Sequence, residues 1–316
     1  MKLSIVIPVY NEEENLSDLY NKIKQALDKN YKDYEIIFVD DGSKDGSFGI
    51  LEKLQKNDPK IVALKFRKNF GQTAAISAGF EYATGDVIIT MDADLQNDPQ
   101  DIPKLLQEMQ EKDLDIVNGW RAPRKDPFLT RRLPSYFANM LISSVTGVKL
   151  HDYGCTLKAF RKDVVKELYL HGEMHRFIPA IASKYGAKIG EVKVSHHPRT
   201  RGKSKYGISR TFKVVLDLIA VKFFLAFSAN PIRFFGSWGL GSSLAGTIIL
   251  LHLAYLKLVL HHSIWGRPLL LFGILLVLVG TQFIAIGLLG EMLARIYHEA
   301  HEKPLYIVKK VLGKTG

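Results

Sequence analysis

The chain has 316 residues, a net charge of +11 and a single cysteine. Its length suits one large domain or two smaller units, and the lone Cys155 excludes an internal disulfide, which fits a reducing compartment. The positive charge flanks apolar C-terminal segments, so anionic lipid is a better partner for it than nucleic acid.

The N-terminal part alternates strand and helix patterns. Leu3–Pro8 is a continuous apolar run, as expected of a strand buried on both faces, and Asn15–Leu27 carries apolar residues at helical spacing. Further strands are expected at Glu35–Val39, Ile61–Lys65, Asp86–Met91 and Ile116–Asn118, and further helices at Ser47–Gln55, Gln72–Ala83 and Pro99–Glu111. This order predicts an α/β fold with a mostly parallel sheet and helices on both faces.

Acidic and polar turns follow three of the expected strands: Pro8–Glu13, Asp40–Ser43 and Asp92–Gln96. Ligands of such sheets bind beyond the carboxyl ends of the strands. Clustered carboxylates are costly unless a cation or hydrogen-bond donors compensate for their charge, and oxygen ligands favour Mg²⁺ or Mn²⁺ shared with substrate phosphates. A solvated acidic turn would explain Asp92-Ala-Asp94 alone, but three converging turns favour a metal site. The glycine-rich phosphate motifs are missing, so metal and basic side chains must hold any pyrophosphate.

Two C-terminal segments, Trp238–Leu260 and Pro268–Gly290, are long and apolar enough to span a membrane. A pair of buried core helices is the alternative. Their outer flanks are far more basic than the short loop between them, which predicts that both ends are cytoplasmic. Four glycines of the first segment, Gly236, Gly239, Gly241 and Gly246, would permit close helix approach.

The segment Ile208–Phe227 has an apolar and a charged face, which predicts a helix in the membrane interface. Packing against the soluble domain is the alternative. The expected domains are therefore a catalytic domain at 1–207, an interfacial helix at 208–228, a two-helix membrane domain at 229–294 and a cytosolic tail at 295–316. Tyr306–Leu312 in this tail is expected to form a strand that extends a sheet of its own chain or of a neighbour, and a homo-oligomer, a tetramer, is expected.

Residues 1 to about 210 resemble a family 2 glycosyltransferase of the GT-A fold. The resemblance is carried by Ile5-Val-Ile-Pro-Val-Tyr-Asn-Glu12, Val39-Asp-Asp-Gly-Ser43, Asn69-Phe-Gly71, Gly85-Asp86 and Met91-Asp-Ala-Asp-Leu-Gln96. With its two apolar segments, the chain resembles polyprenyl-phosphate glycosyltransferases, such as dolichyl-phosphate mannose or glucose synthases and bacterial undecaprenyl-phosphate glucosyltransferases.

The resemblance implies a role for each site residue. It assigns the nucleotide to Pro8, Tyr10, Glu12, Asp40 and Asp41, the diphosphate and metal to Asp92, Asp94 and Gln96, and phosphates to Arg121, Arg131, Arg199, Arg201, Lys203 and Lys205. Asp94, Asp152 and Arg121 are the expected catalytic residues. Structural alternatives are packing for Tyr10, capping of a turn for Asp152, a solvated position before the helix Pro134–Val145 for Arg131, and attraction to anionic lipid for the segment Arg199–Lys205.

The implied reaction is an inverting, metal-dependent transfer of a hexose to undecaprenyl phosphate at the cytosolic face of a bacterial inner membrane. UDP-glucose is the first expected donor, with GDP-mannose or a modified arabinose as alternatives. A phosphate acceptor is already ionised and needs little help from a base, so Asp152 is expected to orient a substrate. A processive polysaccharide synthase, which would carry Gln-x-x-Arg-Trp and more spans, and a nucleotidyltransferase are rival enzymes. A membrane scaffold or transporter component would leave the carboxylates unexplained.

Overall fold

The computed structural model describes residues 1–122, 139–140, 142–143, 146–166, 168, 170, 174–198, 231–263, 268–299 and 306–313. The chain forms two compact units, Met1–Lys222 with Leu305–Gly316, and Phe223–Pro304. Several predictions concern residues outside the described ranges. They are the helix Ile208–Phe227, most of the helix Pro134–Val145, and Arg131, Arg199, Arg201, Lys203 and Lys205.

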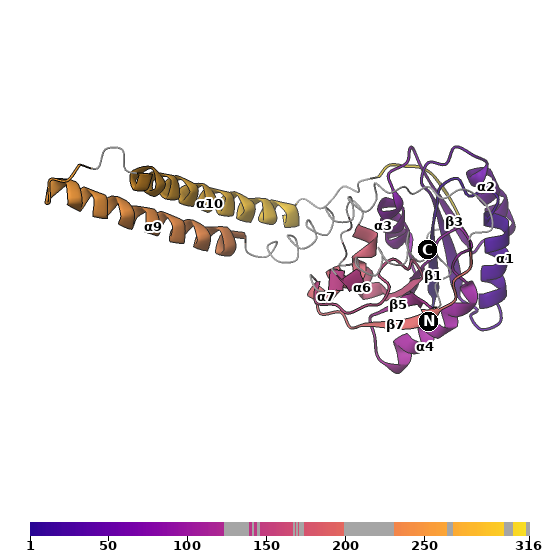
Figure 1. Cartoon of the computed structure of the whole chain (residues 1–316). Coiled ribbons are helices and arrows are strands. Elements are labelled where there is room, and N and C mark those ends of the chain that lie inside the picture. Colours follow the sequence, from indigo (N-terminus) through magenta and orange to yellow (C-terminus); the bar gives the residue numbers. More distant parts are fainter. Residues whose placement is uncertain are drawn as a thin grey trace. The chain divides into compact units, whose positions relative to one another are not determined.

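The first unit is built on a mixed, mostly parallel sheet (Figure 1). Its strands are β1 (Leu3–Val9), β2 (Tyr34–Asp40), β3 (Ile61–Phe66), β4 (Val87–Thr90), β5 (Ile116–Arg121), β6 (Lys158–Arg161), β7 (Ile189–Val194) and β8 (Val308–Leu312). Their order is β7-β5-β6-β4-β1-β2-β3-β8. β6 and β8 run antiparallel to their neighbours, and the remaining pairs are parallel.

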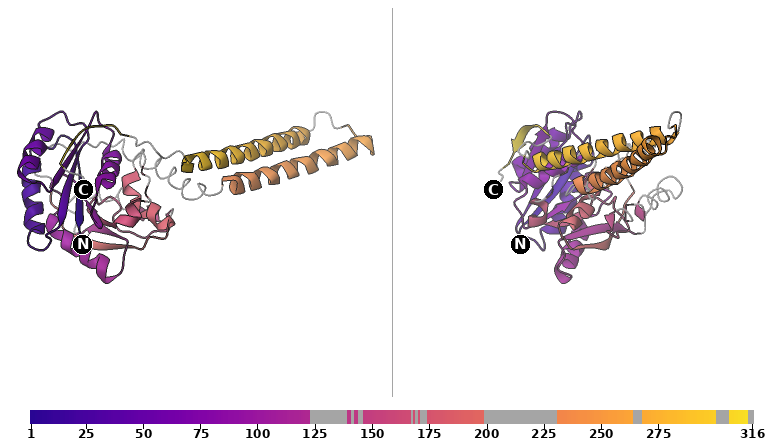
Figure 2. Two further views of the ribbon diagram at one scale, coloured as in Figure 1. Left: turned by 180° about the vertical axis from the view of Figure 1, so that it is seen from behind. Right: turned by 90° about the vertical axis from the view of Figure 1, so that its left-hand side faces the viewer.

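Helices cover both faces of this sheet (Figure 2). One face holds α1 (Leu16–Leu27), α2 (Ser47–Asn57) and α4 (Ile102–Glu111), the last entered through the short helix η1 (Pro99–Asp101). The other face holds α3 (Gln72–Tyr82), α6 (Lys162–Lys166) and α7 (Ile178–Lys184), with η3 (Met174–Arg176) before α7. The predicted α/β architecture is therefore confirmed.

The central strands show why this layering forms. β1 is buried along almost its whole length, and its side chains point alternately to the two faces of the sheet. Leu3, Ile5 and Ile7 belong to the core under α1, whereas Val6 belongs to the core under α3. A strand that buries both faces must be apolar at successive positions. α3 approaches closely because Gly79 lies against the Val6 side chain, where a Cβ atom would clash.

The second unit is a hairpin of α9 (Pro231–Leu258) and α10 (Pro268–Glu299), which run side by side (Figure 1). By length and composition alone, 28 residues of α9 and 26 residues of α10 (Pro268–Leu293) suffice to cross a membrane. Most of their large apolar side chains are exposed, which is not the burial expected of core helices in a soluble domain.

Two of the four predicted glycines lie where α9 and α10 approach each other closely. A Cβ atom at Gly239 would lie 2.7 Å from the carbonyl oxygen of Gly280, and one at Gly246 would lie 2.7 Å from that of Gly273. Gly236 borders Gly287, whereas Gly241 has nothing within 4 Å. Close approach through small residues is a common packing mode of membrane helices.

After α10 the chain returns to the first unit as β8, antiparallel to β3. Tyr306 stacks on Phe66 with ring centroids 4.9 Å apart, and its hydroxyl donates a hydrogen bond to Glu81. The predicted tail strand is thus present and extends the sheet of its own chain. Because β8 begins opposite Phe66, it enters the sheet at the carboxyl end of β3, the same edge at which β7 ends.

Candidate active site

The carboxyl ends of the strands bring the sequence-predicted residues to one edge of the sheet. Asp40 ends β2, and Arg121 ends β5. Tyr10 and Glu12 follow β1, whereas Asp92 and Asp94 follow β4. β6 is antiparallel to both β4 and β5, so those two strands point the same way and end at the same edge. The described residues therefore form a polar rim where an α/β sheet binds its ligands.

Asp40 and Asp41 are adjacent and both buried, but they have different partners. Asp41 accepts hydrogen bonds from the backbone N–H groups of Phe70 at 2.6 Å and Gly71 at 2.9 Å. Asp40 Oδ1 accepts from the Ser43 N–H at 3.0 Å, whereas Asp40 Oδ2 is buried and has no hydrogen-bond partner among the described residues. Burial raises the pKa of both carboxyls, that of Asp41 to about 6. Asp41 thus braces a neighbouring loop, and Asp40 retains a buried acceptor for a ligand.

The turn after β1 is joined to the turn after β2. The N–H of Asn11 donates to Ser43 Oγ and that of Glu12 donates to Ser47 Oγ, both at 2.9 Å. Glu12 Oε2 accepts from Asn15 Nδ2 at 2.7 Å. Pro8, within β1, and Tyr10 are half-buried beside this junction. Hydrogen bonds therefore join the two turns into one continuous wall at the carboxyl edge of the sheet.

The Asp92–Gln96 loop is held by side chains from three directions. Asp92 Oδ1 accepts from Gln72 Nε2 at 2.8 Å, and Asp94 Oδ1 accepts from the Gln96 N–H at 3.2 Å. Between them Leu95 adopts a positive φ of 62°, which closes a tight turn. Asn97 Oδ1 accepts from the Asp92 N–H and from Thr156 Oγ1. This loop presents Asp92 and Asp94 in a fixed arrangement.

The donor atoms of this loop fit a divalent cation that is shared with a substrate. Among the described residues, no group of three or more His, Cys, Asp or Glu side chains forms a complete metal cage. The carboxylates of Asp92 and Asp94 with the amide of Gln96 are a small set of hard ligands. Mg²⁺ and Mn²⁺ accept such a partial set because diphosphate oxygens and water complete their octahedral shell.

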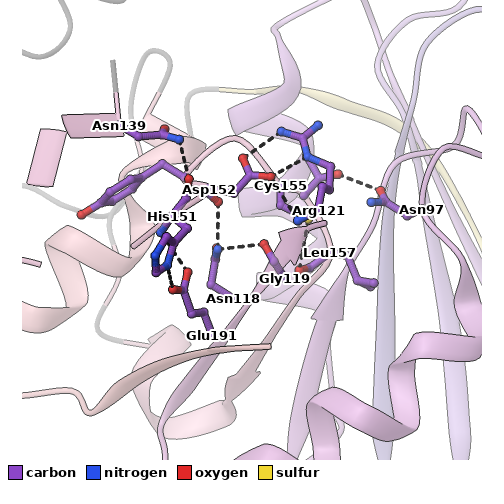
Figure 3. Close-up of polar contacts among 12 residues, drawn as sticks. Asn97, Asn118, Gly119, Arg121, Asn139, His151, Asp152, Cys155, Leu157 and Glu191 are labelled. Carbon is purple, nitrogen blue, oxygen red and sulfur yellow. Dashed lines mark hydrogen bonds and ion pairs between the residues drawn. The ribbon is translucent and has the colours of Figure 1, made fainter. Parts of the chain in front are cut away.

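Arg121 and Asp152 form a two-point ion pair (Figure 3). Arg121 Nε donates to Asp152 Oδ2 at 2.7 Å, and Arg121 Nη2 donates to Asp152 Oδ1 at 2.9 Å. Asp152 is only 2% exposed. Because both carboxylate oxygens face the guanidinium group, Asp152 is suited to orient Arg121 and poorly suited to accept a proton from a substrate.

His151 fixes the turn that carries Asp152 from the outer side. The backbone N–H of His151 donates to Glu191 Oε2 at 2.9 Å, and the His151 ring stacks on Trp120 with centroids 4.2 Å apart. Figure 3 shows His151 beside Glu191, with Asp152 turned away toward Arg121. The neighbouring Cys155 is fully buried, and burial raises the pKa of its thiol to about 11, so it remains a neutral packing group.

The segment that precedes the predicted basic loop lies against the Asp92–Gln96 loop. Asn97 forms a β-bridge with His196, and the His197 N–H donates to the Gln96 carbonyl at 3.0 Å. The Ser195 N–H donates to buried Asp101 at 2.6 Å, and the His197 side chain bonds Asp98 at 3.0 Å. The described residues up to 198 therefore approach the Asp92–Gln96 loop directly.

Sequence reasoning missed several residues that support the site, namely Gln72, Asn97, Asn118, Thr156 and Lys158. Gln72 directly follows the Asn69-Phe-Gly71 motif, which was a usable signal. Lys158 interrupts the apolar run Leu157–Phe160, and a charged residue inside such a run is another signal. Asn97, Asn118 and Thr156 act through contacts between segments that are far apart in the sequence, which no local pattern reveals.

A model of the family described as "Glycosyl transferase family 2" matches residues 4–169. The chain belongs to glycosyl transferase family 2. It is 45% identical over 314 residues to a dodecaprenyl-phosphate galacturonate synthase of Rhizobium johnstonii, covering 98% of this chain and 93% of that protein. It is 39% identical to an undecaprenyl-phosphate 4-deoxy-4-formamido-L-arabinose transferase of Shewanella sediminis, covering 98% and 92%.

The fold of this chain is also similar to that of solved structures. A glucosyl-3-phosphoglycerate synthase of Mycobacterium tuberculosis, crystallised with Mn²⁺, uridine diphosphate and phosphoglyceric acid, superimposes with a TM-score of 0.55. The match covers 71% of this chain and 78% of that one at 16% identity. It confirms the predicted GT-A fold. Family and fold together confirm that this family 2 chain is a glycosyltransferase.

Proposed function

We propose that this family 2 glycosyltransferase transfers a sugar from a nucleoside diphosphate to the phosphate of a polyprenyl lipid at the cytosolic face of a bacterial membrane. One observation carries the proposal: Asp40, Asp92, Asp94 and Arg121 share one edge of the sheet. The nearly full-length similarity to two enzymes named for polyprenyl-phosphate sugar transfer supports it, as does the apolar hairpin of α9 and α10.

The donor's nucleotide would lie along the turns after β1 and β2. The unpartnered Asp40 Oδ2 would accept an N–H of the base, which removes the cost of leaving a buried acceptor unsatisfied. Uracil offers one such imide N–H group, so a uridine nucleotide is the donor we expect. Tyr10, Glu12 and Pro8 would complete this wall, with Asp41 holding it in place through Phe70 and Gly71.

The donor's diphosphate would lie beside Asp92, Asp94 and Gln96, which would also hold Mg²⁺ or Mn²⁺. Such a cation supplies Lewis-acid stabilisation of the leaving diphosphate. A phosphate oxygen of the lipid attacks the anomeric carbon, the bond from that carbon to the diphosphate breaks, and the nucleoside diphosphate leaves with the electron pair. In-line attack inverts the anomeric centre.

Arg121 would contact the acceptor phosphate of the lipid, with Asp152 fixing its Nε and Nη2 edge. The acceptor phosphate is ionised near neutral pH, so no carboxylate has to remove a proton from it. We therefore propose an orienting role for Asp152. The basic segment Arg199–Lys205 and Arg131 remain proposed phosphate ligands by resemblance.

For the sugar, we propose a uronic acid or a modified arabinose in preference to the glucose first expected. The two relatives matched over nearly their full length are named for galacturonate and 4-deoxy-4-formamido-L-arabinose. The 16% identity to the glucosyl-3-phosphoglycerate synthase concerns the fold and gives glucose no support.

The test is a donor panel with purified full-length protein, polyprenyl phosphate and labelled nucleotide sugars. We expect label to enter the organic phase as a sugar–phosphate lipid. The Asp94→Asn variant should lose at least about 100-fold in kcat/KM, the usual loss when one group that stabilises transition-state charge is removed. Asp113→Asn is the matched control, because Asp113 is exposed at the opposite edge of the sheet.

Other outcomes would contradict the proposal. Full activity of Asp94→Asn with a chelator present would exclude the metal assignment. Label in a long polymer would indicate a processive synthase, and label in a nucleotide-linked product would indicate a nucleotidyltransferase.

A further inference from the structure

Lys158 is a buried lysine in the middle of the sheet. It begins β6, is 3% exposed, and pairs with Thr90 of β4 on one side and Asn118 of β5 on the other. Lysine is rarely buried to this extent unless an acidic group pairs with it. Within the part of the chain that the structure describes, no carboxylate forms an ion pair with Lys158, so its burial calls for another explanation.

The Lys158 ammonium group instead binds the backbone of the turn that carries Asp152. Its Nζ atom donates to the carbonyl of Tyr153 at 3.3 Å and to the carbonyl of Cys155. Asn118, its cross-strand neighbour, donates from Nδ2 to the carbonyl of Asp152 at 2.9 Å. Two adjacent side chains of the sheet therefore hold three carbonyls of one turn.

This arrangement determines where the Asp152 side chain lies. The turn residues 152–155 are not part of a strand, so strand pairing does not fix their backbone. With three carbonyls directed to Lys158 and Asn118, the Asp152 carboxylate is directed to Arg121 (Figure 3). Hydrogen bonds from a charged donor are roughly twice as strong as neutral ones. An ammonium group at this position therefore holds the carbonyls of the turn more firmly than a neutral donor would.

We propose that Lys158 is a positioning residue for sugar transfer, acting through the Asp152–Cys155 turn to hold the Asp152–Arg121 pair against the substrate phosphate. This inference rests on the proposed function. A misplacement of about 1 Å in such a group costs on the order of 100-fold in rate, so a residue without substrate contact can still control the reaction.

The charges around Lys158 keep it protonated near neutral pH. Burial lowers the pKa of its ammonium group to about 8, and the carboxylates of Asp152 and Asp92 oppose that decrease, whereas the charge of Arg121 adds to it. His175 and Arg176 line the small cavity beside Lys158. Burial lowers the pKa of His175 to about 3, so His175 is neutral there.

A double-mutant cycle separates positioning from a general structural role. Lys158→Met keeps the aliphatic stem and removes all donors, and should lower kcat/KM for transfer at least about tenfold, given the sensitivity of catalysis to misplacement. Lys158→Arg, which restores a charged donor, should recover part of this loss. In an Arg121→Gln background, Lys158→Met should change kcat/KM by less than about twofold, because its only route of action has been removed.

Binding of uridine diphosphate provides the folding control, because Asp40 on β2 is separated from β6 by β4 and β1. Its affinity should be the same in Lys158→Met and wild type. Lys188→Met is the matched control for loss of a lysine, since Lys188 is exposed at the opposite edge.

Three results would overturn the inference. They are wild-type activity of Lys158→Met, an equal loss in both backgrounds, and loss of uridine diphosphate binding by both Lys158→Met and Lys158→Arg, which would show that the lysine serves the fold as a whole. Failure of the proposed function would give a different result, because the wild-type protein would form no sugar–phosphate lipid with any donor. Both proposals would then be wrong.

Discussion

Asp40 and Asp41 show how far two adjacent carboxylates can differ. The resemblance to family 2 glycosyltransferases implies that both are nucleotide ligands, and both lie at the carboxyl edge of the sheet, where β2 ends. Both carboxylate oxygens of Asp41, however, accept hydrogen bonds from the backbone N–H groups of Phe70 and Gly71, about 30 residues further along the chain. A local pattern can predict that a turn is acidic, but it cannot show which carboxylate a distant loop will occupy.

Asp41 should impose a pH dependence on stability. Its folded pKa of about 6 lies above its ordinary value of 3.8. Between these values the folded protein binds more protons than the unfolded one, so the free energy of unfolding falls as pH rises from about 4 to 6. Asn cannot ionise, so the melting temperature of Asp41→Asn should decrease less over this range than that of wild type.

The measurement is thermal unfolding of the nucleotide-free protein in detergent at pH 4 to 7. Asp113→Asn is the control, because Asp113 is exposed and Lys188 lowers the pKa of its carboxyl. The melting temperature of this variant should fall at least as much over the same pH range as that of wild type. Parallel curves for wild type and Asp41→Asn would contradict the assignment.

At the scale of elements, the helix hairpin shows what glycine spacing can and cannot predict. The sequence identifies α9 as glycine-rich, but Gly239 and Gly246 face α10 and Gly241 does not. Gly239 and Gly246 are seven residues apart, as are Gly273, Gly280 and Gly287 on α10. Two turns of helix return a residue to nearly the same face, so the matching spacing on the two helices would have singled out the contact residues.

This packing leads to a comparison between two substitutions of equal size. Gly280→Leu adds a side chain where Gly239 and Ser243 leave no space, so it should separate the helices and lower the melting temperature in detergent. Gly241→Leu adds the same volume where no atom lies within 4 Å and should leave the melting temperature unchanged. Equal effects of the two changes would show that the hairpin does not pack in this way.

The sheet itself was only partly predictable. Its parallel strands β1 to β4 are continuous apolar runs, and their positions follow from the sequence. β6 was missed, because four residues that begin with Lys158 and end with Arg161 do not resemble a buried strand. β7 was missed too, since its residues Ile189–Val194 are mostly half-buried and include Glu191 and Lys193. These two strands flank β5 and carry residues that contact the turn of Asp152, so the surroundings of Arg121 and Asp152 could not be predicted from the sequence.

At the scale of the whole molecule, the hairpin is an insertion between two strands of one sheet. β7 precedes it and β8 follows it, and both meet the sheet at the edge that holds Asp92 and Asp94. If α9 and α10 each cross a membrane, the chain must return to the side from which it left. The sheet thus agrees with one part of the topology expected from the positive-inside rule, namely that both ends of the chain lie on the same side of the membrane.

Single cysteines can test this topology, because the native Cys155 is buried. Ser263→Cys lies in the exposed connection after α9, and Lys309→Cys lies on exposed β8. An impermeant maleimide should label Ser263→Cys in intact cells and Lys309→Cys only after the inner membrane is permeabilised. Labelling of Lys309→Cys in intact cells would exclude the proposed orientation, and unmodified protein serves as the background.

The return of β8 also links assembly of the sheet to biogenesis in the membrane. β3 has no partner on its outer side until β8 is made, and β8 is synthesised after both apolar helices. A chain whose second helix failed to insert correctly would leave β8 on the wrong side and the edge of β3 exposed. Unpaired edge strands promote aggregation, so incorrectly inserted chains would be open to removal by proteases. Pairing of β8 with β3 would then distinguish correctly inserted chains from incorrectly inserted ones, before any substrate binds.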